Sequence, residues 1–292
     1  MYLDYWKLQE KPFENTPNPH FAYWSKEHEE ALSRMLYVVK EKKGAALITG
    51  EYGSGKTFLT RVLLKELAED KYQEALILNP MLSPAQLIKE VIHQLGGKIA
   101  NSATKAVAFN RLNELLLDIN KNNKLAVIVV DEAQAIQSSA SFEEFRLMLN
   151  FQLNDSFLLT LILIGQPELG KKIAQLPQLE QRIALRFHLR ALGEVETREY
   201  VLRRLNIAGG DEYIFSSDAF PEIFVYTRGI PRKINNLCDL ALLVGKDQEA
   251  KSIDREIIRK VVADLEGREY QPEEKKINQA DVGDGILLTG GL

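Results

Sequence analysis

Short, continuous runs of apolar residues alternate along the chain with longer segments in which apolar residues recur every three or four positions. Four runs are predicted strands, and a fifth, weaker run follows them: residues 45–49, 75–79, 125–130, 157–164 and 187–189. The segments between them have the spacing of amphipathic helices. Continuously apolar strands separated by helices are typical of a parallel sheet covered on both faces, so the pattern predicts an α/β domain.

Capping residues indicate where several of these helices begin. Ser25 is the predicted N-cap of a helix that runs to about Lys40. Residues 83–86 (SPAQ) are a predicted capping box with proline in the first helical position, and Gly96 is expected to close that helix. Residues 141–144 (SFEE) are a second predicted capping box, which opens a helix after the third strand.

From Gly193 onward the pattern is helical. Helices are predicted near residues 194–207, 217–227, 231–245 and 254–265, which indicates a small all-α domain. The predicted organisation is therefore an aromatic N-terminal arm at 1–25, an α/β domain at 26–192, a helical domain at 193–266 and a flexible tail at 267–292.

The first 25 residues are rich in aromatic side chains and contain both tryptophans of the chain, Trp6 and Trp24. Pro12, Pro17 and Pro19 interrupt any regular element, which predicts an extended arm lying on the body of the protein. Two interpretations stay open. The aromatic rings bury apolar area against the body, or they contact an adenine ring or a neighbouring subunit.

Composition predicts a soluble globular protein and points to no polyanionic partner. Hydrophobic residues make up 45% of the chain and charged residues 27%, which suffices for a buried core and a hydrated surface. The formal net charge of −4 gives no overall attraction to nucleic acid or to an anionic membrane. The single cysteine, Cys238, and the lack of any run of about 18 apolar residues favour a cytoplasmic protein without a membrane span.

The loop after the first strand has the spacing of a phosphate-binding loop. It consists of Gly50, Glu51, Tyr52, Gly53, Ser54, Gly55, Lys56 and Thr57, which match the pattern G-x-x-x-x-G-K-[ST]. An apolar strand precedes it and the helical pattern of residues 58–67 follows, which is the context that the pattern requires. Glycines let successive backbone N–H groups point at phosphate oxygens. Lys56 is expected to reach the β- and γ-phosphates of ATP, and Thr57 to hold Mg²⁺.

Polar side chains also follow the third and fourth strands. Because the carboxyl ends of parallel strands meet at the ligand-binding edge of a sheet, Asp131 is expected close to Mg²⁺, directly or through water. Glu132 is expected to activate the attacking water as a general base. Gln166 is expected near the γ-phosphate, where its amide helps to place that water. The alternatives are that Asp131 and Glu132 only cap the next helix, and that Gln166 is a turn residue.

Arginines are candidates for contacts to the γ-phosphate. Arg182 is the first choice, and Arg186 the second, for an arginine that stabilises transition-state charge across a subunit boundary. The alternative is a solvated basic face between residues 171 and 190. Arg232 follows Pro231 at the start of a predicted helix and is expected to reach the γ-phosphate from the helical domain.

Together these motifs resemble those of AAA+ ATPases and, more narrowly, of the general secretion pathway protein A (ExeA-type) family. The resemblance covers about residues 1–266 and includes YWKLQEKPF at 5–13, TPNP at 16–19, GQPEL at 165–169, LEQRI at 179–183 and GIPRKIN at 229–235. It implies a parallel-sheet P-loop AAA+ nucleotide-binding domain, a small all-α lid domain, and ATP bound between the subunits of a homo-oligomer. It further implies Walker A roles for Lys56 and Thr57, Walker B roles for Asp131 and Glu132, sensor roles for Gln166 and Arg232, and an arginine finger at Arg182.

Three functional hypotheses follow. The first is an ATPase that uses Mg²⁺ and ATP to drive assembly or remodelling of a secretion or pilus-type envelope machine, in the cytoplasm or peripherally at the inner membrane. The second is a DNA-binding regulator of the transposition type, which the acidic net charge disfavours. The third is a nucleotide-controlled scaffold with little turnover.

Overall fold

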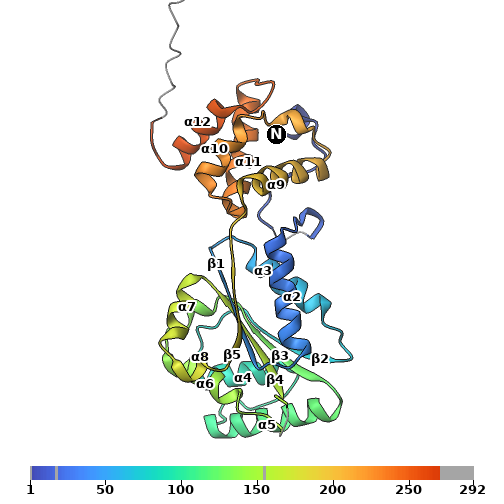
Figure 1. Ribbon diagram of the computed structural model, residues 1–292, viewed down its shortest axis with the longest axis vertical. Helices are drawn as coiled ribbons and strands as arrows, with labels where there is room; N and C mark the ends of the chain where they lie inside the picture. Colours follow the sequence, from blue (N-terminus) through green and yellow to red (C-terminus); the bar gives the residue numbers. More distant parts are fainter. Residues whose placement is uncertain (1, 17–18, 154–155, 270–292) are drawn as a thin grey trace, which may run out of the picture.

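A computed structural model describes residues 2–16, 19–153 and 156–269 of the chain. It consists of a lobe built on a β-sheet and a smaller helical lobe, with the N-terminus lying in the helical lobe (Figure 1). The polypeptide crosses between the lobes before helix α2 and again after strand β5 (Figure 1). The predicted α/β domain followed by a helical region is therefore confirmed.

Five parallel strands form one sheet in the order β2-β3-β4-β1-β5. Their bounds are Ala45–Gly50 (β1), Tyr72–Ile77 (β2), Leu125–Val130 (β3), Leu159–Gly165 (β4) and Ile183–Leu189 (β5). The three inner strands are almost wholly buried, which explains their continuously apolar sequences. Since all strands run the same way, the loops that follow β1, β3 and β4 lie at one edge of the sheet.

The two edge strands differ from their sequence-based bounds. β5 begins four residues before the predicted strand, because its residues alternate between covered and exposed positions and so interrupt the apolar run. β2 begins three residues early and ends two residues early, and it includes the polar residues Gln73 and Glu74. An edge strand is partnered on one side only, so it tolerates polar residues that an inner strand excludes.

Helices cover both faces of the sheet. α2 (Lys26–Lys40) and α3 (Lys56–Glu66) pack on one face, where they share an apolar core with Val129. The other face, which includes Ile128, packs against helices from the remaining connections. These are α4 (Pro84–Gln94), α5 (Lys105–Lys121), α6 (Ser139–Met148), α7 (Pro167–Ala174) and α8 (Pro177–Glu180).

The predicted caps are confirmed for two helices and wrong for a third. The Ser25 side chain accepts a hydrogen bond from the backbone of α2, and Ser83 forms a capping box at the start of α4. α6 is instead capped by Ser138, three residues before the predicted position. Ser141 lies inside that helix, buried, where its hydroxyl donates to the Leu82 carbonyl oxygen. The prediction was wrong because the Ser141 hydroxyl binds a residue distant in the sequence and not the backbone at the start of α6.

The helical lobe contains α9 (Glu194–Ile207), α10 (Ala219–Thr227), α11 (Pro231–Asp247) and α12 (Arg255–Leu265). The N-terminal segment belongs to the same apolar core and is not an extended arm throughout, since it begins with the short helix α1 (Leu3–Trp6). The Trp6 indole nitrogen donates to the Leu242 carbonyl oxygen at 2.8 Å. Gly245 leaves room for the ring, because a Cβ there would lie 2.9 Å from it. The packing interpretation therefore describes this part of the segment.

The predicted tail begins within the described residues but continues beyond them, from residue 270 to the end of the sequence. We propose that the boundaries of the sheet lobe lie near residues 25 and 192. The first boundary separates the sheet lobe from a segment that packs with the helical lobe, and the second lies in the connection between β5 and α9.

Replacing Trp6 by alanine is expected to destabilise the helical lobe by roughly 3–5 kcal/mol, because it removes a buried ring and leaves a cavity. Urea unfolding followed by far-ultraviolet circular dichroism measures the effect. Tyr213→Ala is the control, since that ring is 74% exposed and its loss should change little. Equal effects of the two substitutions would contradict the packing described for Trp6.

Candidate functional site

The loop between β1 and α3 requires glycine at two positions. Gly53 and Gly55 have φ angles of +82° and +101°, in the left-handed region that glycine adopts without strain. Neighbouring atoms also exclude a larger residue. A Cβ at Gly55 would lie 2.7 Å from the Nε2 atom of His28, and one at Gly53 would lie 2.6 Å from the Cβ of Arg232. The loop is thus held between α2 and the helical lobe.

Lys56 lies buried within this loop. Its ammonium group donates to the carbonyl oxygens of Gly50 and Glu51, both at 2.8 Å. Burial lowers the pKa of Lys56, whereas the nearby carboxylates of Glu132 and Asp131 act in the opposite direction. The Ser54 hydroxyl is also buried and has no hydrogen-bond partner among the described residues. A buried cation beside an unpartnered hydroxyl fits an anionic ligand such as a phosphate group.

Asp131 connects the end of β3 to the start of α3. Its carboxylate accepts one hydrogen bond from the Thr57 hydroxyl and one from the Glu132 backbone N–H, both at 2.9 Å. Burial raises the pKa of Asp131, and these two hydrogen bonds oppose that shift. A hydroxyl and a carboxylate oxygen are the kinds of ligand that Mg²⁺ prefers, so this pair fits a magnesium ion.

Glu132 has a backbone conformation that is unusual for its residue type. Its φ angle is +51°, in the left-handed region. It precedes the short helix η2 (Ala133–Ala135), yet its side chain makes no capping hydrogen bond to that helix. α6, the next α-helix, is capped by Ser138. Capping therefore does not account for the acidic pair, and the Glu132 side chain lines a pocket beside the phosphate-binding loop.

Gln166 lies at the same edge of the sheet, at the N-cap of α7 and without a side-chain cap. Its backbone N–H donates to the Oε1 atom of Gln134 at 3.0 Å. Gln166 is not one of the described residues that line the pocket beside the phosphate-binding loop. The structure thus places Gln166 beside the Glu132 loop and leaves its predicted role toward the γ-phosphate a prediction.

Arg232 reaches the phosphate-binding loop from the helical lobe. Its guanidinium carbon lies 4.7 Å from the centre of the Tyr52 ring and it donates a hydrogen bond to the Tyr52 hydroxyl. Its backbone N–H points to the Gly53 carbonyl oxygen at 3.4 Å. The structure therefore brings Arg232 together with the phosphate-binding loop, and its contact with the γ-phosphate stays a prediction.

A pocket opens between the lobes. Its lining comes from the N-terminal segment, the phosphate-binding loop, Glu132 and the helical lobe, and includes Asn15, Phe21, Tyr23, Tyr52, Lys56, Thr57, Tyr200, Arg204 and Asn235. The sequence analysis did not identify Tyr200 or Arg204, because no local motif marks a residue whose partners lie far away along the chain. Asn235 ends the GIPRKIN motif, but the sequence analysis gave it no role in a pocket.

Arg204 joins the N-terminal segment to this pocket. The buried guanidinium donates to the carbonyl oxygens of Pro12 and Glu14 and to the Tyr200 hydroxyl. The Tyr200 hydroxyl donates in turn to the side-chain oxygen of Asn235 at 2.9 Å. These bonds hold residues 12–14 against the helical lobe, at the side of the pocket away from the sheet.

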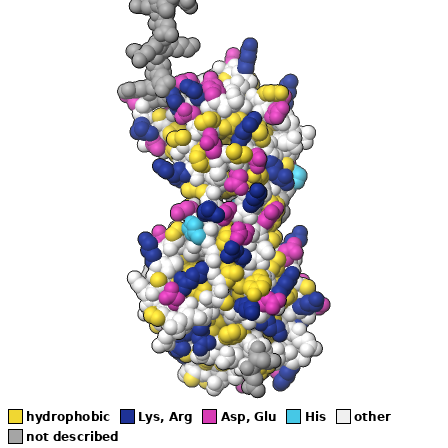
Figure 2. All heavy atoms as spheres, viewed as in Figure 1, with side chains coloured by type: hydrophobic (Ala, Val, Ile, Leu, Met, Phe, Trp, Pro, Cys, Tyr) yellow, Lys and Arg dark blue, Asp and Glu magenta, His cyan; other side chains and the backbone are white. Residues whose placement is uncertain are grey.

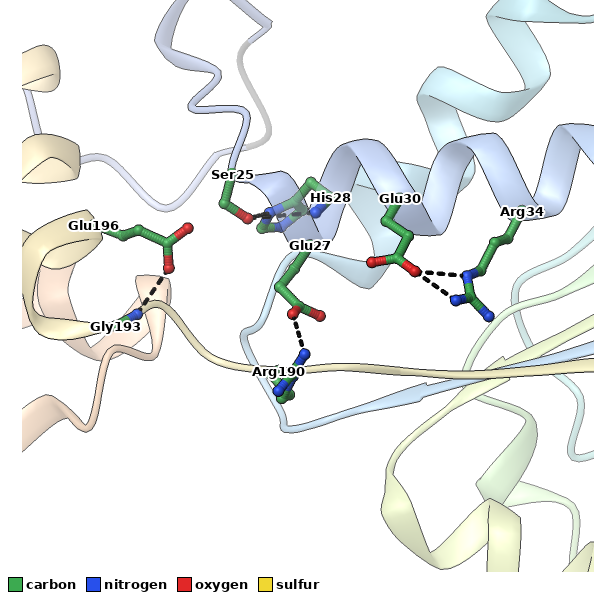
Figure 3. A network of polar contacts seen from close by, with 8 residues as sticks. All are labelled: Ser25, Glu27, His28, Glu30, Arg34, Arg190, Gly193 and Glu196. Atoms are coloured by element: carbon green, nitrogen blue, oxygen red, sulfur yellow. Dashed lines mark hydrogen bonds and ion pairs between the residues drawn. The ribbon is translucent and has the colours of Figure 1, made fainter.

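His28 supports the phosphate-binding loop from α2, and sequence analysis alone did not assign it a role. Its Nδ1 atom lies 2.6 Å from the Ser25 hydroxyl, and its Nε2 atom lies 3.1 Å from the Ser54 carbonyl oxygen. Figure 3 shows this pair at the first turn of α2, beside the ion pair of Glu27 with Arg190, whose charged groups are 2.7 Å apart. The first turn of α2 thus contacts both the loop and the connection between the lobes.

Arg182 lies far from the phosphate-binding loop of its own chain. It precedes β5, whose first residue pairs with Ala45, whereas the loop begins at Gly50, roughly 16 Å away along β1. Its guanidinium donates to the Leu149 carbonyl oxygen at 3.0 Å. Arg186 is exposed on β5 and pairs with Glu180. The structure does not bring either arginine together with the other candidate residues.

Comparison with known proteins identifies relatives of the sheet lobe and of the whole fold. A family model described as an AAA domain matches residues 39–173. General secretion pathway protein A of Aeromonas hydrophila is 37% identical over 247 residues, which are 84% of this chain and 45% of that protein. The chain therefore spans less than half the length of this curated relative.

Solved structures share the fold at low sequence identity. The Aeropyrum pernix ORC2 protein has a TM-score of 0.61 at 18% identity, over 87% of this chain and 71% of that chain. Cdc6p from Pyrobaculum aerophilum has a TM-score of 0.62 at 15% identity, over 86% of this chain and 69% of that chain. The RuvB branch migration motor of Thermotoga maritima has a TM-score of 0.53 at 17% identity, over 83% of this chain and 69% of that chain. These likenesses show a parallel five-stranded AAA+ fold followed by a helical region.

Stability is expected to depend on the protonation of His28. Burial depresses its pKa in the folded protein below the value of about 6.5 found in unfolded chains. The unfolded state therefore binds more protons near that pH, so the stability contributed by neutral His28 is lost as the pH falls below about 6.5. Between pH 7.5 and 5.5, the urea midpoint should fall more for the wild type than for His28→Gln, whose amide still reaches Ser54. Parallel pH dependences would contradict this assignment.

Proposed function

The chain is an AAA-domain protein related to general secretion pathway protein A, and on that basis we propose that it binds and hydrolyses ATP in the pocket between its lobes. The observation that carries the proposal is the meeting of Lys56, Thr57, Asp131 and Glu132 at one edge of the sheet, opposite Arg232 of the helical lobe.

Each part of the pocket has a distinct proposed task. The loop of residues 50–57 binds the phosphate groups through its backbone N–H groups and the Lys56 ammonium group. The N-terminal end of α3 adds further backbone N–H groups. Thr57 and Asp131 hold Mg²⁺, which neutralises phosphate charge when it is bound. The adenine base is received between the N-terminal segment and the side of the pocket that contains Tyr200 and Arg204. The aromatic N-terminal segment would then both pack against the helical lobe and contact the adenine ring.

Glu132, Gln166 and Arg232 are proposed to act at the γ-phosphate. The Glu132 carboxylate accepts a proton from the attacking water, and the Gln166 amide helps to place that water. Arg232 leaves the exposed face of Tyr52 for the γ-phosphate, a stronger partner because its negative charge is concentrated on oxygen atoms. This exchange would couple the nucleotide state to the position of the helical lobe.

The position of Arg182 supports a site shared between subunits. An arginine at the opposite end of β1 cannot serve the phosphate-binding loop of its own chain without large rearrangement, so a role at the γ-phosphate requires the loop of a neighbouring subunit. We therefore propose a homo-oligomer in which Arg182 acts in trans as an arginine finger.

The biological role is proposed from the relationship to general secretion pathway protein A. We propose that ATP turnover drives assembly or remodelling of a secretion or pilus-type envelope machine, with this chain in the cytoplasm or peripherally at the inner membrane. Across the described residues, every helix is too short or too polar to cross a membrane. On the face seen in Figure 2, positive and negative side chains are interspersed, which gives no support to the DNA-binding alternative.

Removing the Glu132 carboxylate should separate binding from turnover. Glu132→Gln is expected to lower kcat by roughly 10²–10⁴-fold with little change in ATP affinity, because it removes a general base. Lys56→Ala should weaken ATP binding itself, whereas Lys65→Ala, an exposed change on the same helix, should have no effect. Steady-state hydrolysis and fluorescent-nucleotide binding measure both quantities. Normal turnover by Glu132→Gln would exclude the mechanism, and wild-type turnover no faster than that of Lys56→Ala would favour the scaffold hypothesis.

Mixing two inactive variants tests whether Arg182 acts in trans. Arg182→Ala and Glu132→Gln should each hydrolyse ATP poorly, but a mixed oligomer contains interfaces that combine an intact Glu132 with an intact Arg182. ATPase activity should therefore rise in the mixture above the sum of the two alone. The same experiment with Arg186→Ala distinguishes the second candidate. If the variants co-assemble and no ratio restores activity, Arg182 is not the finger.

A further inference from the structure

The side-chain amide of Gln134 joins two of the candidate catalytic positions. Its Nε2 atom donates to the Oε2 atom of Glu132 at 2.5 Å, and its Oε1 atom accepts from the backbone N–H of Gln166 at 3.0 Å. The orientation of the amide follows from its partners. A backbone N–H can only donate and a carboxylate can only accept, so the amide oxygen must face Gln166 and the amide nitrogen must face Glu132.

The surrounding structure holds Gln134 in place from two sides. Lys172 of α7 donates to the backbone carbonyl oxygens of Gln134 and Ile136, at 2.6 and 2.8 Å. Gly165 at the end of β4 leaves the space that the amide fills, because a Cβ there would lie 2.5 Å from the Oε1 atom of Gln134. These contacts tie the loop after β3 to the end of β4 and the start of α7.

Glu132 depends on this support more than an ordinary glutamate would. Its backbone has the left-handed conformation, which costs about 1 kcal/mol or more for a residue with a Cβ. The Asp131 carboxylate accepts its N–H, and the Gln134 amide engages one of its carboxylate oxygens. The bond to Asp131 therefore holds the backbone of Glu132, and the bond to Gln134 sets the direction of its side chain.

We propose that Gln134 is a positioning residue for the ATP hydrolysis proposed above. It fixes the direction of the Glu132 carboxylate, leaving the second carboxylate oxygen to accept the proton of water. Through its bond to the Gln166 backbone, it also transmits movement of α7 to Glu132. This inference rests on the proposed function and adds a residue that does not itself contact ATP.

Two substitutions at Gln134 test the contributions of its two side-chain hydrogen bonds, one to Glu132 and one to Gln166. Gln134→Leu removes both, whereas Gln134→Glu keeps an acceptor for Gln166 and replaces the donor with a carboxylate that repels Glu132. Both are expected to lower kcat by roughly 10- to 100-fold, the usual cost of a misplaced catalytic group, with ATP affinity changed less than about threefold. Gln134→Glu should recover part of the loss at lower pH, because the introduced carboxyl group donates to Glu132 once it is protonated.

Hydrogen exchange provides a readout that does not depend on activity. The Gln166 amide hydrogen should exchange faster in Gln134→Leu, which has lost the acceptor, and at nearly the wild-type rate in Gln134→Glu. Gln94→Glu is the matched control, since it breaks an exposed amide–carboxylate bond to Glu90 on α4 without touching the site. That control should alter neither the exchange of Gln166 nor kcat.

A double-mutant cycle tests whether Gln134 acts through Glu132. In a Glu132→Gln background, Gln134→Leu should reduce the residual turnover less than about twofold, because the carboxylate that it positions is gone. A further loss as large as that in the wild-type background would overturn the proposal and indicate a structural role. Wild-type turnover by Gln134→Leu would also overturn it while leaving the ATPase assignment intact. A wild-type chain that does not hydrolyse ATP would remove both.

Discussion

The common direction of the five strands is the constraint on which the rest of the site depends. In β1, Thr49 pairs with Gly165 of β4, and in β3, Val130 pairs with Leu163 of the same strand. The residues that follow these strands therefore emerge side by side although they lie far apart in the sequence. Reversing β1, β3 or β4 would move the polar residues that follow it to the opposite edge of the sheet, away from the others.

The same constraint explains why part of the site could be predicted from sequence. A buried parallel strand has a continuous apolar sequence, so a polar residue directly after it marks the ligand edge, as Asp131 does after β3. The residues of the phosphate-binding loop have a local pattern of their own. The edge strands and the cap of α6 were less predictable, since exposure on one side or a distant partner such as Leu82 overrides the local signal.

Sequence reasoning failed most completely for residues whose partners are distant. Arg204 is buried against carbonyl oxygens of residues 12 and 14, about 190 positions away, and nothing near it in the sequence indicates a pocket. His28 contacts the backbone of Ser54, and a backbone acceptor leaves no trace in the sequence. Such contacts are decided by the packing of the two lobes, which local patterns do not encode.

The contacts between the N-terminal segment and the two lobes differ in strength. Trp6 and Arg204 hold the segment in the helical lobe through buried contacts, and a buried guanidinium released from its acceptors would lose several charge-assisted hydrogen bonds. Between the lobes, by contrast, Arg232 lies on the exposed ring of Tyr52, and its backbone N–H donates to the Gly53 carbonyl oxygen at 3.4 Å. Each of these contacts is worth about 1 kcal/mol. The N-terminal segment is therefore mechanically part of the helical lobe. A change in the angle between the lobes would break the weak contacts first and would carry residues 12–16 with the helices, altering the pocket from both sides at once.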